Sequence, residues 1–148
     1  MGVITGAGTE LAISAAVPAT DTEAGFEALT YTRIAYASNL GTYGPTTELQ
    51  TFNALFEGEI QLKGTTRKGQ MNPVIALDRS DAGQALAIAA AADPTDEYSI
   101  RVTFSNGEKD YMRVQVLGVP KTVGDSSSPV TWQPIFALKT LPIEVSAA

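Results

Sequence analysis

Apolar and polar side chains alternate along several short stretches of the chain. The clearest is residues 56–63, where the apolar residues and Gly58 share one face and charged or amide side chains take the other. A period of two over this length predicts a strand with one covered face and one charged face. Runs of strand-forming residues at 30–37, 74–77 and 130–138 predict further strands. We therefore expect a mainly β fold.

Two alternating runs flank Asn106-Gly107, a dipeptide typical of β-hairpin turns. A two-residue loop at this pair would place the apolar residues of the two strands on opposite faces. A three-residue loop, residues 105–107 with Gly107 in the left-handed region, aligns them. We predict the three-residue loop with its bulge. It gives the cross-strand pairs Tyr98 with Val114 and Ile100 with Met112.

Residues 80–92 are expected to form the one helix. Ser80 or Asp81 can cap its N-terminus, and Gln84 stands where the partner residue of a capping box would. The alanine-rich interior lets such a helix lie close against a sheet. A proline follows Asp93 and disfavours the α region there, so the helix is expected to end at this residue.

Segments rich in glycine, proline and polar residues separate these elements. The first 28 residues are expected to form an N-terminal arm rather than a packed element, and residues 143–148 a short tail. Between the strands we expect a long polar connection around residues 41–45, a polar turn at 64–70 and a flexible loop at 120–129.

The length of 148 residues fits one domain. We expect residues 1–148 to form a β-sandwich or partial barrel with one flanking α-helix, whose β core spans residues 29–142. An extended N-terminal arm, a long inter-strand loop and a C-terminal tail complete it.

Composition narrows the possible chemistry. The chain contains no cysteine and no histidine, which excludes thiolate catalysis, metal sites built from those residues and imidazole-based triads. Glycines 64 and 69 have the spacing of a phosphate-binding loop, but Gln70 and Met71 replace its lysine and its Ser or Thr. Acidic residues near the helix ends have the positions of caps. We predict no enzyme, no metal site and no cofactor.

The chain is acidic, with a formal net charge of −6. Such a surface repels nucleic acid and disfavours a module that grips phosphates, although solubility alone also accounts for it. No basic residue precedes Arg33, so the positive region of a signal peptide is lacking. No apolar run approaches the roughly 20 residues that span a bilayer. We expect a protein made in a cytoplasm, without membrane insertion of its own.

The order of these motifs resembles the major tail tube proteins of long-tailed phages with non-contractile tails. Two strings carry the likeness: RSDAGQAL at residues 79–86, similar to the family's "GQQAL"-like helix start, and YSIRVTFSNG at residues 98–107, similar to its "IRFPNG"-like hairpin. The preceding glycine-bounded turn at 64–69 fits the same order. The resemblance covers about residues 30–142, and the extra immunoglobulin-like domain of some relatives is expected to be absent.

The resemblance implies a structural subunit that forms hexameric rings, which stack into a hollow tube. The tube would enclose a tape-measure protein, meet terminator and baseplate or tip proteins, and conduct DNA into the host cell without binding it specifically. The location implied is the tail of a virion, after assembly in the host cytoplasm.

Site residues follow from the same resemblance. Glu57 and Glu59 are candidates for an acidic lumen surface, although an ordinary solvated outer face is the simpler account of them. The long loop is implied to reach the neighbouring ring, and Tyr43, Phe52 and Phe56 are as consistent with core packing as with that contact. The candidates for contacts between rings are Tyr43, Phe52, Phe56, Arg67 and Lys68.

The sequence is also compatible with three other functions. A type VI secretion-like tube protein belongs to the same structural class. A small carbohydrate- or peptide-binding β-sandwich would need an exposed aromatic platform, for which Trp132 and five tyrosines are available. A carboxylate-based hydrolase would use a pair such as Glu57 and Glu59.

Overall fold

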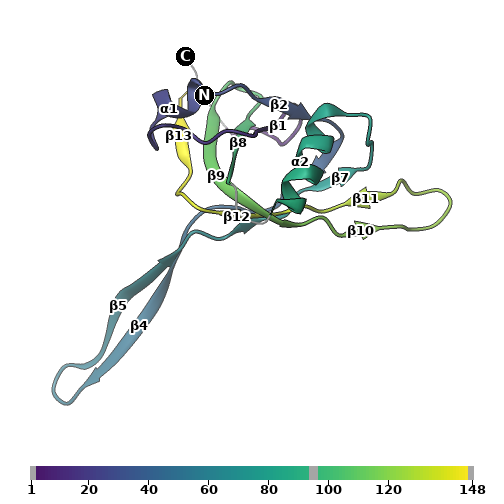
Figure 1. The fold of residues 1–148 in the computed structure, drawn as a ribbon. Helices are drawn as coiled ribbons and strands as arrows, with labels where there is room; N and C mark the ends of the chain where they lie inside the picture. Colours follow the sequence, from purple (N-terminus) through teal and green to yellow (C-terminus); the bar gives the residue numbers. More distant parts are fainter. Residues whose placement is uncertain (1–2, 94–96, 147–148) are drawn as a thin grey trace.

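The chain folds into antiparallel sheets and two helices, so the mainly β class is confirmed (Figure 1). The structure is a computed structural model and describes residues 3–93 and 97–146. Its largest sheet has seven strands in the order β2-β1-β8-β9-β12-β6, with β13 also paired to β9. These strands are β1 (Glu10–Ser14), β2 (Thr32–Ile34), β6 (Gln70–Met71), β8 (Tyr98–Thr103), β9 (Lys109–Gly118), β12 (Ile135–Leu138) and β13 (Ile143–Val145).

Two smaller sheets complete the strands. A four-stranded sheet has the order β10-β11-β7-β3, and β4 and β5 form a two-stranded sheet of their own. The helices are α1 (Glu23–Glu27) and α2 (Ala82–Ala92). The strands are β3 (Ala37–Asn39), β4 (Thr46–Ala54), β5 (Gly58–Arg67), β7 (Val74–Ala76), β10 (Lys121–Thr122) and β11 (Thr131–Trp132).

The hydrophobic core joins the seven-stranded sheet, the four-stranded sheet and α2. Ile13, Ile100 and Val114 contribute from the seven-stranded sheet, Trp132 from the four-stranded sheet and Ala87 from α2. Each of these residues is at most 1% exposed. The helix approaches closely because its contact residues are small. At Gly83, an added Cβ would lie 2.1 Å from the carbonyl oxygen of Arg33, so only glycine fits.

Gln84 lies at the centre of this packing, and the capping-box prediction for its side chain is wrong. Asp81 caps α2 as expected, accepting a hydrogen bond from the Gln84 backbone N–H at 3.0 Å. The Gln84 amide points inward instead. It donates to the carbonyls of Ala35 and Ala76 at 2.9 and 3.0 Å, and accepts from the Trp132 indole at 3.1 Å. Buried polar groups in proteins are normally hydrogen-bonded, and here these bonds tie α2 to β7 and β11 of the four-stranded sheet.

The predicted hairpin register between β8 and β9 is confirmed. Tyr98 pairs with Val114 and Ile100 with Met112. Gly107 has a φ of 93°, as the bulged three-residue loop requires. The helix also ends as predicted, with Asp93 as its C-cap; the proline after it lies outside the described residues.

The prediction of an unpacked N-terminal arm is wrong for most of its length. β1 lies inside the large sheet between β2 and β8, with Leu11 and Ile13 buried. Residues 15–31 then cross the other face of β8 and β9, where Phe26 is fully buried and stacks on Tyr111 at 5.6 Å between ring centroids. Arg101 lies over the Tyr31 ring at 4.8 Å. Packing therefore starts at β1, and α1 is a second, unpredicted helix.

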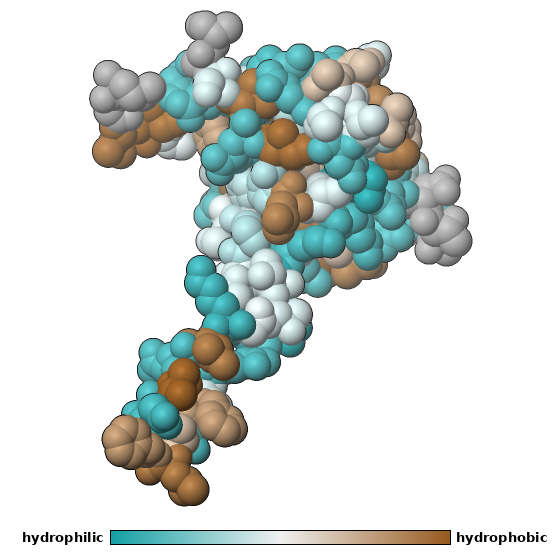
Figure 2. Space-filling model, turned by 90° about the vertical axis from the view of Figure 1, so that its left-hand side faces the viewer, coloured by the Kyte–Doolittle hydropathy of each residue, from teal (hydrophilic) through white to brown (hydrophobic). Residues whose placement is uncertain are grey.

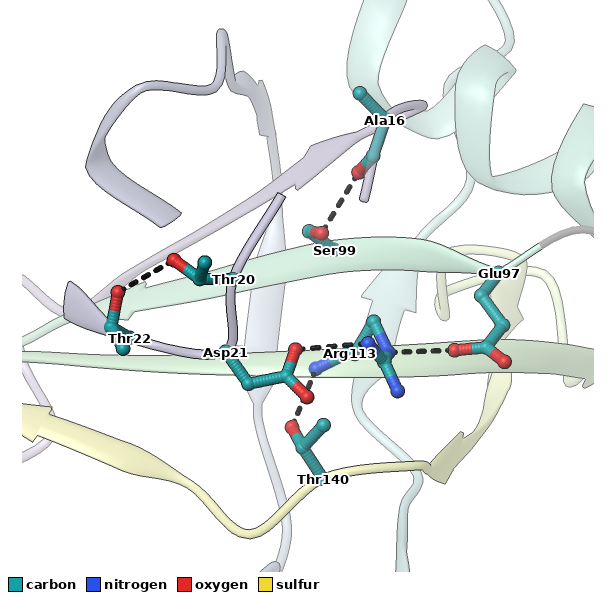
Figure 3. A network of polar contacts seen from close by, with 8 residues as sticks. All are labelled: Ala16, Thr20, Asp21, Thr22, Glu97, Ser99, Arg113 and Thr140. Atoms are coloured by element: carbon teal, nitrogen blue, oxygen red, sulfur yellow. Dashed lines mark hydrogen bonds and ion pairs between the residues drawn. The ribbon is translucent and has the colours of Figure 1, made fainter. Parts of the chain in front are cut away.

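Polar contacts hold this crossing segment in place (Figure 3). The Arg113 guanidinium on β9 pairs with Asp21 at 2.9 Å and with Glu97 at 2.8 Å, so the two carboxylates converge on one cation. The Ser99 hydroxyl donates to the carbonyl of Ala16 at 2.8 Å. Thr140 accepts from the backbone N–H of Arg113 at 3.1 Å.

Several other segment predictions need correction. The run at 130–138 is two strands in different sheets, β11 and β12, because Gln133 and Pro134 interrupt it. The run at 30–37 is likewise divided into β2 and β3, at Tyr36 with its positive φ of 64°. Residues 121–122 of the expected flexible loop form β10, and residues 143–145 of the expected tail pair with β9 as β13.

Candidate functional site: a projecting hairpin and the groove at its root

β4 and β5 form a long hairpin that projects from the rest of the molecule (Figure 1). The strands pair from Thr46 with Arg67 at the root to Ala54 with Gly58 at the tip. Gly58 has a φ of 77°, which suits the turn at residues 55–57. Near the root, Arg67 pairs with Glu48 at 2.6 Å, and the hydroxyls of Thr47 and Thr66 lie 3.0 Å apart. The predicted polar turn at 64–70 is therefore wrong up to Arg67, since β5 continues to that residue.

The hairpin carries large apolar side chains that nothing in the described chain covers. They gather toward the far end of the projection in Figure 2. The side chain of Phe56 is 94% exposed, and Leu55 beside it is fully exposed. The expected covered face of residues 56–63 is therefore open to solvent within this chain. The exposed apolar residues of the hairpin are Leu49, Phe52, Leu55, Phe56 and Leu62.

The root of the hairpin is fixed to the body by Tyr43. Its ring packs against the core, and its hydroxyl donates a hydrogen bond to the carboxylate of Asp110 on β9. Two glycines bring the chain together where it enters and leaves the hairpin. Gly69 has a φ of 86°, and a Cβ on it would meet the carbonyl oxygen of Gly44 at 3.0 Å. The projection therefore begins from a defined point of the body.

Acidic groups surround this attachment. Burial raises the pKa of the Asp110 carboxyl, and the charges of Glu144 and Glu108 raise it further, against the opposing effect of the Tyr43 hydrogen bond. Burial, together with the bond to Asp110, also raises the pKa of the Tyr43 hydroxyl far above its ordinary value. Tyr43 therefore stays protonated and remains the donor.

A groove of about 460 Å³ lies beside the same root. It is bounded by Lys68 at the end of the hairpin, Lys139 after β12, and the apolar run Leu141 to Ile143. Arg113 and Asp21 form part of its wall, and Figure 3 shows them facing each other. The Arg113 guanidinium already has two carboxylate partners, so its positive charge is more than balanced. None of the ion pairs among the described residues involves Lys68 or Lys139.

The hairpin brings together most of the site residues predicted from sequence. Phe52 lies on β4 opposite Ile60, Phe56 and Glu57 lie in the tip, and Glu59 lies on β5 opposite Asn53. Tyr43 is a half-buried residue of the root. The Arg67 guanidinium already has Glu48 as its partner, whereas Lys68 faces the groove.

Other residues of this surface had no clear sequence signal, except Leu62, which belongs to the alternating run at 56–63. Leu49 and Leu62 lie on opposite faces of the hairpin, and Leu55 is in the turn. The alternation of residues 46–54 could have indicated β4, but its threonines and amides read as a polar connection. Asp110, Lys139 and Leu141 reach the root only through long-range sheet pairing, which local patterns do not encode.

Residues 3–93 and 97–146 contain no group of three or more acidic residues placed to hold a metal ion. The described helices include none with the length and apolar character to cross a membrane. Glu57 and Glu59 lie on the exposed tip, where both carboxylates are open to water.

Comparison with known proteins gives a match of fold but not of sequence. No protein-family model matches the chain, and no curated protein matches it. Among solved structures, it is similar to a chain in the cryo-EM structure of the PVC sheath/tube terminator, part of an extracellular contractile injection system, in the extended state. The TM-score is 0.70 over 99% of both chains, at 7% identity. At that identity the likeness shows a shared fold across the whole length.

Proposed function

We propose that this chain is a structural subunit of a phage-tail-like tube, in which copies form rings and the rings stack. The observation that carries the proposal is the β4–β5 hairpin, with its exposed apolar residues and a fixed root. The full-length fold match to a chain of a sheath/tube terminator structure supports the same class of role.

A lone two-stranded hairpin is at best marginally stable in water, because neither face is covered. Contiguous exposed apolar surface on a soluble chain is typical of a protein–protein interface. Covering Phe52, Phe56 and Leu62 on another subunit would stabilise the hairpin and the assembly together. A structural role in an assembly uses this feature, whereas a solitary enzyme or binding module leaves it unexplained.

The finer form of the proposal follows the resemblance to phage tail tube proteins. Rings of six copies would stack into a hollow tube that encloses a tape-measure protein and conducts DNA in a virion tail. The net charge of −6 supports a passage to which DNA does not adhere. Partners would be further copies of the chain, the tape measure, and terminator and baseplate or tip proteins.

A terminator ring is the second candidate function. It is favoured by the particular structure that the chain resembles, which is a sheath/tube terminator. A terminator closes the end of a tube, so it would form single rings and bind tube ends without stacking on itself. A type VI-like tube would share the stacked form and differ in what it delivers.

Negative-stain electron microscopy of the concentrated purified chain tests the proposal. Uniform hollow tubes, or six-fold rings that stack, are expected for a tube subunit. Single rings that never stack would favour the terminator. A monomer at every concentration, with no binding to tubes or tail fragments, would overturn both. A panel of glycosides assayed with the wild type and with Glu57→Gln/Glu59→Gln addresses the hydrolase alternative, for which we expect no turnover.

A further inference from the structure

We propose that the groove beside the hairpin root is the docking site for the hairpin tip of a second copy of this chain. This inference rests on the proposed function, and it names the surface that the projecting hairpin meets. The occupant is a second copy because the tip and the groove are complementary in both charge and apolar character.

The tip presents apolar and acidic side chains together. Leu55 and Phe56 are exposed at the turn; Glu57 follows them in the turn and Glu59 lies at the start of β5, where its carboxylate accepts a hydrogen bond from the Gln61 amide at 3.0 Å. No ion pair among the described residues involves either carboxylate. The tip can therefore bury apolar surface and offer two anions at the same contact.

The groove presents the matching combination. Leu141, Pro142 and Ile143 form its apolar part, and Leu141 is 49% exposed. Lys68 and Lys139 border it without ion-pair partners in the described part of the chain, while Arg113 is already paired with both Asp21 and Glu97. An apolar floor with two unpaired ammonium groups suits an apolar tip whose two carboxylates lack a cationic partner.

The geometry makes this contact intermolecular. The nine residues of β4, at about 3.4 Å each, separate tip and root by about 30 Å. A paired hairpin cannot fold back over that distance onto its own root. Each copy therefore offers one tip and one groove, which is a head-to-tail contact that can repeat without end. The second copy would be displaced from the first by about the length of the hairpin, so this contact would join successive rings.

Paired charge reversals test the contact. Glu57→Lys/Glu59→Lys and Lys68→Glu/Lys139→Glu are each expected to lower the sedimenting, tube-containing fraction at least fivefold, because like charges then meet. The quadruple variant has the wild-type net charge of −6 and restores opposite charges, so it is expected to return within about twofold of wild type. Arg79→Glu/Lys121→Glu is the control with the same charge change as the groove variant, outside the groove. Thermal melts confirm that each variant is folded.

Cysteine cross-linking gives a second test that does not depend on charge. The chain has no native cysteine, so Leu55→Cys/Leu141→Cys places one thiol at the tip and one in the groove. Mild oxidation should give a ladder of linked multimers, whereas each single variant can give at most dimers.

The outcomes separate this contact from the proposed function. Tubes that form normally in both charge-reversal doubles, or a quadruple variant that stays defective while folded, would overturn the docking site and leave the tube proposal standing. Dimers without a ladder from the two-cysteine variant would also overturn it. Absence of any ring or tube in the wild type would instead remove the function on which the inference rests.

Discussion

The hydroxyl of Tyr43 donates a hydrogen bond to the carboxylate of Asp110, joining the segment that leads into the hairpin to β9 of the large sheet. Asp110 is 9% exposed, so its carboxylate has little access to water as an alternative partner. This bond therefore holds the direction in which the hairpin leaves the body.

Removing the Tyr43 hydroxyl should weaken the fold. Tyr43→Phe keeps the ring but leaves a mostly buried carboxylate without its donor, which costs about 1–3 kcal/mol of unfolding free energy. Urea denaturation of dilute protein measures the change. Tyr36→Phe is the control, because that ring is 62% exposed and its change should stay within about 0.5 kcal/mol. Equal destabilisation by the two variants would contradict the structural role of the Tyr43 bond.

Asp110 should also make stability depend on pH. Its pKa is raised in the fold, chiefly by burial, with Glu144 and Glu108 adding to the effect, so the folded state binds its proton more tightly than the unfolded state. The folded state therefore loses stability from this group as pH rises through the window above the ordinary value of 3.8. Asp110→Asn removes that group.

Thermal melts of wild type and Asp110→Asn between about pH 4 and pH 7 check this sign. The melting temperature of the variant, relative to wild type, is expected to increase as pH rises. A difference that stays constant, or that falls as pH rises, would mean that burial does not penalise the Asp110 charge.

Gln84 should be among the most sensitive polar positions of the chain. Gln84→Leu leaves the Trp132 indole N–H and the carbonyls of Ala35 and Ala76 without their buried partner. At about 1–3 kcal/mol for each stranded group, a loss of at least about 3 kcal/mol is expected. Chemical denaturation measures it, with the exposed Gln133→Leu as a control that should change little. A similar midpoint for both would show that the network contributes no net stability.

Gly83→Ala tests the close approach of α2 to β2. The new methyl group would lie 2.1 Å from the Arg33 carbonyl oxygen, and backbone on both sides must move to admit it. Overpacking costs about 1–3 kcal/mol, and the upper end is expected because neither neighbour is a flexible side chain. Urea denaturation measures the loss, and Gly118→Ala, whose methyl group meets nothing within 4 Å, is the control. If Gly83→Ala were as stable as wild type, the helix would be able to shift at no cost.

Local signals in the sequence were sufficient for some elements and not for others. The Asp81 cap and the Asn106-Gly107 turn are formed by neighbouring residues, so their patterns predict them directly. β1 has five residues and pairs with β8 about 90 positions later in the chain, so its partner cannot be inferred from its own composition. The same holds for β13, whose three residues become a strand only through β9.

The hairpin shows a different limit. The alternation in residues 56–63 predicts a strand with one covered face; the strand is confirmed from Gly58 onward as β5, but its apolar face is not covered within this chain. Phe56 and Leu62 lack any cover from their own chain. The sequence therefore predicts the apolar face, and the structure places it on an exposed projection instead of in the core.

Shortening the hairpin separates folding from assembly. Replacing residues 50–62 by Asn-Gly would leave the Leu49–Lys63 pair joined by a two-residue turn, and would keep the Glu48–Arg67 ion pair at the root. The removed residues make no contact with the hydrophobic core, so the melting temperature of the body should change little. Assembly should be lost, because Phe52, Leu55 and Phe56 leave with the tip. Analytical ultracentrifugation across a concentration series measures both the monomer and any multimer. A shortened chain that still assembles like wild type would show that the subunits meet through other surfaces, and the hairpin would then need another partner to cover it.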